Sequence, residues 1–269
     1  MAYVQGGRDP VGLWYETALP SRTRSSMRDT SHQSMGAQSL ASYTHNMLHH
    51  FAENISDSKD LCSYRGIDRR GRPERVDYKN DDESGYDLPA NFYVLDASYR
   101  MFLWTGDRSY VNDFVFLNFY KRTVDDYVER WQLASGDVMR RKHWLNIHDT
   151  FDPQDNMQTA RGVPGCRGGP RDYIVGMDLL ATEEYQALKD YACIETYRGA
   201  ADDGPKLESA LESLLETIKL NPSSQVEGES HYPEVLYRHG KPDIGYQEIM
   251  DLTRPRALVS SSIRRFPTR

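Results

Sequence analysis

Apolar residues recur at helical spacing in five separate windows of this chain, and this recurrence most limits how the chain can fold. Side chains three or four positions apart lie on one face of a helix, so each window can bury a stripe against a neighbour. No window shows the sustained alternation of apolar and polar residues that a half-exposed β-sheet produces. The sequence therefore predicts a nearly all-α fold. The five stripes are Leu40, Tyr43, Met47 and Phe51; Phe92, Leu95, Tyr99 and Phe102; Leu117, Tyr120, Val124, Tyr127 and Trp131; Met177, Ala181, Tyr185, Leu188 and Ala192; and Leu207, Leu211, Leu214 and Ile218.

Breaks between the stripes predict the connections. The glycine of WTGD (Trp104 to Asp107) is expected to end the second helix. Residues 138–172 are rich in Gly, Pro, His and Asp, which predicts a long irregular segment. The turn sequence RGAADDGP joins the fourth and fifth stripes, so their helices are expected to form an antiparallel hairpin. A sixth element is expected over 232–252, which gives one helical domain over 1–252 and an irregular tail over 253–269.

Charge and composition argue against several classes of partner. The chain has 40 acidic and 33 basic side chains, a net charge of −7, and its basic residues are dispersed, so nucleic acid is not an expected partner. No apolar run approaches the ~20 residues of a membrane helix, and the first residues lack the apolar stretch of a signal peptide, so we expect no membrane association. Localisation stays open between the cytoplasm and export of a protein with a longer N-terminus. Three widely spaced cysteines, Cys62, Cys166 and Cys193, indicate structural thiols.

Three stretches together resemble a known superfamily: RDTSHQSMGAQ, LPANFYVLDASYRMFLWTGDRSYV and GESHYPEVLYRHGKPDIGYQEIMDL. They resemble the (α/α)6 six-hairpin glycosidases, the toroid of trehalases, glucoamylases and α-L-rhamnosidases, over roughly residues 10–252. The resemblance implies two concentric rings of helices, a sugar site among the loops at one end, and no cofactor. An (α/α)6 toroid has twelve helices by definition, whereas the stripes account for about six, so we expect a partial toroid of antiparallel hairpins.

The resemblance implies glycoside hydrolysis, which uses one carboxylic acid to protonate the leaving oxygen and a second carboxylate to activate water or to attack. Inverting enzymes, the type expected here, hold the two groups about 6.5–9.5 Å apart. The acidic stretch DYKNDDESGYDLPANF offers the acid, with Asp81 as first choice and Asp87 as second. The alternative is a solvated loop in which Asp87 merely favours the N-terminus of a helix that Pro89 starts.

The stretch VEGESHYPE offers the catalytic base. Glu229 is the preferred residue, and Glu227 and His231 beside it are candidate substrate-binding residues. The alternative is an ordinary helix start, in which Ser230 caps the helix and the following Pro233 occupies its first turn.

The stretch RDTSHQ combines a predicted helix cap with a candidate sugar clamp. Thr30 and Gln33 fit the S/T-x-x-E/Q capping box, so a helix is expected to begin at Thr30. Arg28 and Asp29 before it can hold sugar hydroxyls, because a guanidinium donates in a planar fork and a carboxylate accepts. The resemblance supports that role, and His32 and Gln33 are expected to add further contacts.

Several aromatic and histidine residues also have a structural alternative to a functional role. Trp144 is the best candidate for stacking on a sugar ring, whereas Trp104 and Trp131 are expected in the core. His45 and His49 have the i, i+4 spacing of metal ligands, with His50 adjacent. No HExxH glutamate accompanies them, so satisfied or surface histidines and no metal are expected.

Three functions remain open from the sequence. The leading one is a glycoside hydrolase acting on an oligo- or polysaccharide, or a fragment of such an enzyme. An inverting glycoside phosphorylase would instead need a phosphate site in place of the base, and the acidic VEGESHYPE loop argues against it. The third is a helical scaffold or a sugar-binding remnant without catalysis. The identity of the sugar and the oligomeric state are left open.

Overall fold

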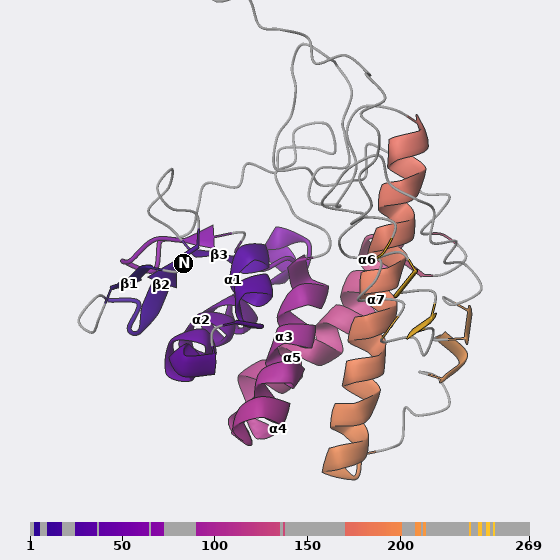
Figure 1. Cartoon of the computed structure of the whole chain (residues 1–269). Coiled ribbons are helices and arrows are strands. Elements are labelled where there is room, and N and C mark those ends of the chain that lie inside the picture. The colour runs from indigo at the N-terminus through magenta and orange to yellow at the C-terminus, as the bar shows by residue number, and fades with distance from the viewer. Residues whose placement is uncertain are drawn as a thin grey trace, which may run out of the picture.

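The computed structural model describes residues 3–5, 10–17, 25–36, 38–64, 66–72, 90–134, 137 and 170–200, with a few helical residues between 208 and 250. This part is mostly helical, which confirms the predicted all-α class (Figure 1). None of its helices is both long enough and apolar enough to cross a membrane. The helices are α1 (Met27–Gln33), α2 (Ala41–Glu53), α3 (Ala90–Thr105), α4 (Ser109–Asn112), α5 (Phe114–Arg122), α6 (Val128–Arg130) and α7 (Pro170–Arg198), with short turns η1 (Gln38–Leu40) and η2 (Asp57–Lys59) and a π-helical turn η3 (Thr123–Tyr127).

The first four predicted helices are present. The stripe of the first is buried through Met47 and Phe51 of α2, and the third stripe runs through α5, η3 and α6 without a break. Gly106 ends α3 as predicted, with a left-handed φ of 69° that a glycine adopts without strain. Residues 208–210 and 212–213 of the predicted fifth helix are helical, and the rest of it lies outside the described residues.

Two expectations at helix ends were wrong. α7 begins at Pro170, so 170–172 are helical and not part of an irregular segment. Proline suits that position because its missing N–H is unpaired in any first turn. Trp104 is 45% exposed although it was expected in the core, because it lies in the last turn of α3, where the chain turns away at Gly106. Trp131, at 6% exposure, is in the core as predicted.

Four short strands were not predicted. β1 (Tyr3–Gln5) pairs antiparallel with β2 (Trp14–Glu16), and β3 (Ser25–Ser26) pairs with β4 (Gly66–Ile67). All three residues of β2 are buried, so this strand lacks the alternation that a sequence pattern can detect. Both strand pairs lie beside the N-terminal helices of the bundle (Figure 1). β3 leads directly into α1.

The long helices alternate in direction along the chain. The start of α2 lies next to the end of α3, since both line one cavity. At the other end, Asn91 at the start of α3 donates a hydrogen bond to the Leu61 carbonyl, which follows the end of α2. α2 and α3 are therefore antiparallel. α7 runs parallel to α3, because Tyr99 bonds Cys193 and Phe102 contacts Tyr197 one turn further on. We call the end of the bundle with α1 and the starts of α3 and α7 the α1 end, and the opposite end the α4 end.

The core is rich in aromatic rings. Phe92 meets Tyr127 edge-on across α3 and η3, at 5.8 Å between ring centroids. Tyr120 donates from its hydroxyl to the Tyr110 carbonyl, which ties α5 to α4. Large aromatic side chains supply much of the buried apolar area, so this core is held together by ring packing. The largest fully buried side chains are Trp14, Tyr15, Tyr110, Tyr120, Tyr127, Phe51, Phe92, Phe116, Phe119, Met47 and Leu48.

Candidate functional site

The candidate site at the α1 end begins with the cap of α1. The Ser26 hydroxyl accepts a hydrogen bond from the Asp29 backbone N–H at 3.4 Å, so the helix starts at Met27. The predicted capping box at Thr30 is therefore wrong. Thr30 is buried inside the helix, and its hydroxyl bonds the Ser25 hydroxyl at 2.8 Å. Gln33 does not reach back to Thr30, because its side-chain amide donates to the Thr17 carbonyl at 3.0 Å.

Arg28 and Asp29 lie in the first turn of α1 and not ahead of it. Their side chains form an ion pair, with 4.0 Å between Arg28 Nε and Asp29 Oδ1, and both are partly exposed. The Asp29 carboxylate is favourable at a helix N-terminus, where the backbone N–H groups carry partial positive charge. The pair thus offers a cation and an anion side by side at the protein surface, which is the donor and acceptor set that the predicted clamp requires.

His32 connects α1 to α3. Its ring meets the ring of Tyr93 edge-on, with centroids 4.4 Å apart and an angle of 76° between the planes. Tyr93 belongs to the first turn of α3, so this contact holds α1 beside the start of α3. Four of the predicted site residues, Arg28, Asp29, His32 and Gln33, are therefore together. The other six, Asp81, Asp87, Trp144, Glu227, Glu229 and His231, lie outside the described residues.

Glu184 in α7 was missed by the sequence analysis. Its side chain is 1% exposed, and its Oε2 atom has no hydrogen-bond partner among the described residues. Burial raises the pKa of this carboxyl well above its ordinary value, because the charged form loses its hydration. A signal was present in the sequence. Glu184 stands three residues after Ala181 and four before Leu188, on the apolar stripe itself.

The parallel packing of α3 and α7 sets the level of Glu184 in the bundle. Cys193 of α7 is level with Tyr99 of α3, since the two side chains are hydrogen-bonded. Glu184 precedes Cys193 by nine residues, or roughly 13 Å along the helix axis, which brings it level with the start of α3. The buried acid and the α1 residues are therefore at the same end of the bundle.

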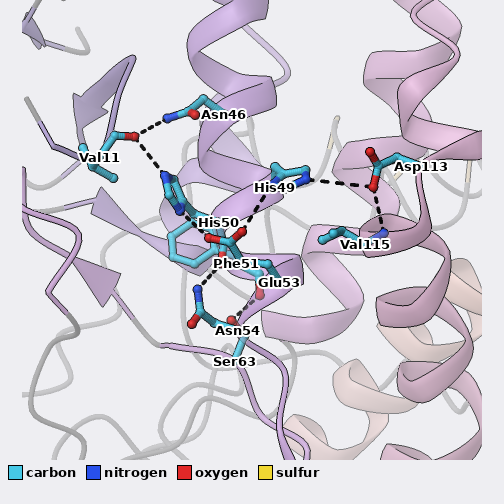
Figure 2. A network of polar contacts seen from close by, with 10 residues as sticks. All are labelled: Val11, Asn46, His49, His50, Phe51, Glu53, Asn54, Ser63, Asp113 and Val115. Atoms are coloured by element: carbon cyan, nitrogen blue, oxygen red, sulfur yellow. Dashed lines mark hydrogen bonds and ion pairs between the residues drawn. The ribbon is translucent and has the colours of Figure 1, made fainter. Parts of the chain in front are cut away.

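The three histidines of α2 have polar partners, as predicted. His50 lies between the Glu53 carboxylate, at 2.7 Å from Nδ1, and the Val11 carbonyl, at 2.9 Å from Nε2 (Figure 2). His49 lies between Glu53 and Asp113, at 3.6 and 3.9 Å. Within the described part of the chain, no group of three or more His, Cys, Asp or Glu side chains is arranged to hold a metal ion.

Comparisons with known proteins do not narrow the function. No protein-family model matches the chain, and no curated protein or solved structure is detectably similar to it.

Proposed function

We propose that the chain is a glycoside hydrolase, or part of one, that cleaves an oligo- or polysaccharide with inversion and is built as a segment of an (α/α)6 toroid. The observation that carries the proposal is the packing direction of the four longest helical elements. α3 and α7 are parallel neighbours, and α2, which is antiparallel to α3, packs against α5. α5 also runs opposite to α3, because it starts after α4 and its continuation η3 brings Tyr127 against Phe92 at the start of α3. A toroid of helical hairpins has this arrangement, because its inner helices share one direction and its outer helices the other.

Burial supports the assignment of α3 to the inner ring. Nine consecutive residues at its start, 90–98, are all buried, so no face of this half of the helix is exposed to solvent. α5 instead buries Phe116, Phe119 and Tyr120 while Phe114 is 79% exposed, as an outer helix with one covered face would. Loops that precede inner helices meet at one end of a toroid. In the proposal that end is the α1 end.

In the proposal, the catalytic residues act at this end of the bundle. Asp87 precedes Ala90 by three residues, a separation that the chain can span only to about 11 Å, so the acidic stretch joins α3 close to α1. In the proposal Asp81, or in its place Asp87, protonates the leaving oxygen, Glu229 activates water, and Arg28 with Asp29 holds the hydroxyls of the reacting sugar.

Glu184 enters the proposal as a second candidate for the acid. A general acid needs a proton at the pH of the reaction, and burial favours the protonated form of this carboxyl by raising its pKa. Buried carboxyls without partners cost stability, and such groups gather at functional sites more often than elsewhere.

The test is a hydrolysis assay of the full chain on trehalose, maltotriose and a rhamnose-containing oligosaccharide. We expect Asp81→Asn and Glu229→Gln each to lower kcat by ~10²–10⁴-fold, the usual contribution of general acid or base catalysis. Azide should rescue Glu229→Gln by replacing the activated water, and a substrate with a good leaving group should rescue Asp81→Asn. The control is Glu129→Gln, which changes an exposed carboxylate in α6. Full activity in both variants would refute the assignment, and sugar binding without hydrolysis would favour the sugar-binding remnant.

A further inference from the structure

A second polar site lies at the α4 end of the bundle, away from the proposed sugar site. A cavity of about 220 Å³ opens between the start of α2 and the turn from α3 to α4. This volume can hold a small organic molecule of several heavy atoms. Its lining residues are Ala41, Ser42, His45, Thr105, Asp107 and Tyr110.

Only one assignment of donors and acceptors fits the hydrogen bonds beside the cavity. Ser109 Oγ is 2.7 Å from His45 Nε2 and 2.8 Å from Asp107 Oδ1. An ionised carboxylate can only accept, so the single Ser109 proton goes to Asp107. His45 must then donate its Nε2 proton to Ser109. Although a Ser, a His and an Asp are in contact, Ser109 is not an activated nucleophile, because its proton does not point to the imidazole.

This direction fixes the state of His45. With the proton on Nε2, the Nδ1 atom of a neutral imidazole is an acceptor. Burial lowers the pKa of His45 below its ordinary value, an effect that Asp107 and Asp113 oppose and the neighbouring His49 reinforces. The neutral ring is therefore favoured at neutral pH.

The cavity is electrostatically negative. Among the described residues that line it, Asp107 is the only Asp, Glu, Lys or Arg, and hydrogen bonds from the Ser109 N–H and hydroxyl keep the pKa of Asp107 below its ordinary value. Both of those bonds use Oδ1, and no described residue donates to Oδ2. Ala41, Ser42, Thr105 and the 1% exposed Tyr110 complete the lining with His45. The lining thus offers one available carboxylate oxygen.

We propose that this cavity binds a small aliphatic amine, whose ammonium group donates to Asp107 Oδ2 and whose carbon chain occupies the rest of the cavity. An anion is disfavoured because the cavity lining, in the part of the chain that the structure describes, contains neither Lys nor Arg. An ammonium is preferred to a hydroxyl because a charge-assisted hydrogen bond to a carboxylate is roughly twice as strong as a neutral one. The proposal does not depend on the sugar site, since the two lie at opposite ends of the bundle.

Two probes that differ in one group test the proposal: 4-aminobutan-1-ol and butane-1,4-diol. Binding to the full chain is measured by calorimetry and by shifts of the backbone amide signals of residues 107–110. We expect the amine to bind at least about tenfold more tightly than the diol, which corresponds to about 1.4 kcal/mol. Equal binding of both probes would overturn the ammonium assignment, and binding of neither would overturn the site.

Asp107→Asn provides the matched variant. Asparagine keeps an oxygen that can accept from the Ser109 N–H, so the turn should stay folded, which the amide spectrum checks. The preference for the amine should disappear in this variant and persist in Asp126→Asn, which changes an exposed carboxylate of η3. A preference that survives Asp107→Asn would contradict the proposal. Amine binding should also weaken below the ordinary histidine pKa of 6.5, because protonated His45 repels the ammonium; His45→Gln should remove that dependence.

Discussion

At the scale of single residues, Glu184 is the side chain that most clearly lowers the stability of the folded state. Its carboxyl is buried and its Oε2 atom has no hydrogen-bond partner among the described residues, so ionisation is the state that costs most. Its pKa in the folded state is raised above the ordinary value of 4.5. Below pH 4.5 both states are protonated and the group costs nothing through ionisation. As the pH rises through 4.5 the unfolded state loses its proton first, so Glu184 lowers the stability of the fold at higher pH.

Glu184→Gln should remove this pH dependence, because glutamine does not ionise. We expect the free energy of unfolding, measured in urea at pH 4 and pH 7, to rise in the variant relative to the wild type at pH 7 and to change much less at pH 4. Glu129→Gln, at an exposed position, is the control and should show no such difference. An equal effect of Glu184→Gln at both pH values would mean that the carboxyl ionises freely in the folded state.

At the scale of elements, the end of α3 depends on a single backbone conformation. Gly106 has a φ of 69°, and its N–H donates to the Phe102 carbonyl at 2.8 Å, which closes the last turn. A side chain at this position would meet no heavy atom within 4 Å, so the cost of adding one comes from the backbone alone.

Gly106→Ala should therefore destabilise the protein by about 1–2 kcal/mol, the cost of a left-handed conformation for a residue with a Cβ. The matched control is Gly36→Ala, because an alanine there has a nearest neighbour at 4.0 Å and needs no left-handed φ. Thermal unfolding of the two variants measures the difference. Alanine at a compatible φ is expected to be neutral or stabilising, so a loss in Gly36→Ala as large as that in Gly106→Ala would show that the left-handed φ does not set the cost.

The same elements show what the sequence can predict. α2, α3 and α5 are predicted well because each buries a stripe at helical spacing. β1 to β4 are missed because two or three residues are too few to show a period. The π-helical η3 is missed because the apolar stripe continues through it at Val124 and Tyr127. Helix starts depend on competing caps, and Ser26 replaces Thr30 because the Ser26 hydroxyl reaches the Asp29 N–H.

Sites are harder to predict than helices because they join distant parts of the chain. His45 and Ser109 are 64 residues apart, and no local pattern predicts that their side chains meet. Arg28 and Asp29 were found because they are adjacent in the sequence. Glu184 could have been found, since a charged residue is unusual within an apolar stripe.

At the scale of the whole molecule, the helical bundle has two ends that carry different side chains. The α1 end carries Arg28 and Asp29 and the buried Glu184. The α4 end carries the Asp107 cavity. Figure 1 shows α1 and α4 at different levels along the bundle.

Hydrogen exchange with and without saturating sugar tests the central claim most directly. Trehalose, maltotriose and a rhamnose-containing oligosaccharide are each added to the Glu229→Gln variant, which should bind the sugar without consuming it. The account predicts slower exchange of backbone amides in 25–36 and 90–98 with at least one of these sugars, and no change in 101–112, because bound sugar restricts opening of the segments that it contacts. Slower exchange confined to 101–112, or no change in 25–36 and 90–98 with every sugar, would contradict a sugar site at the α1 end.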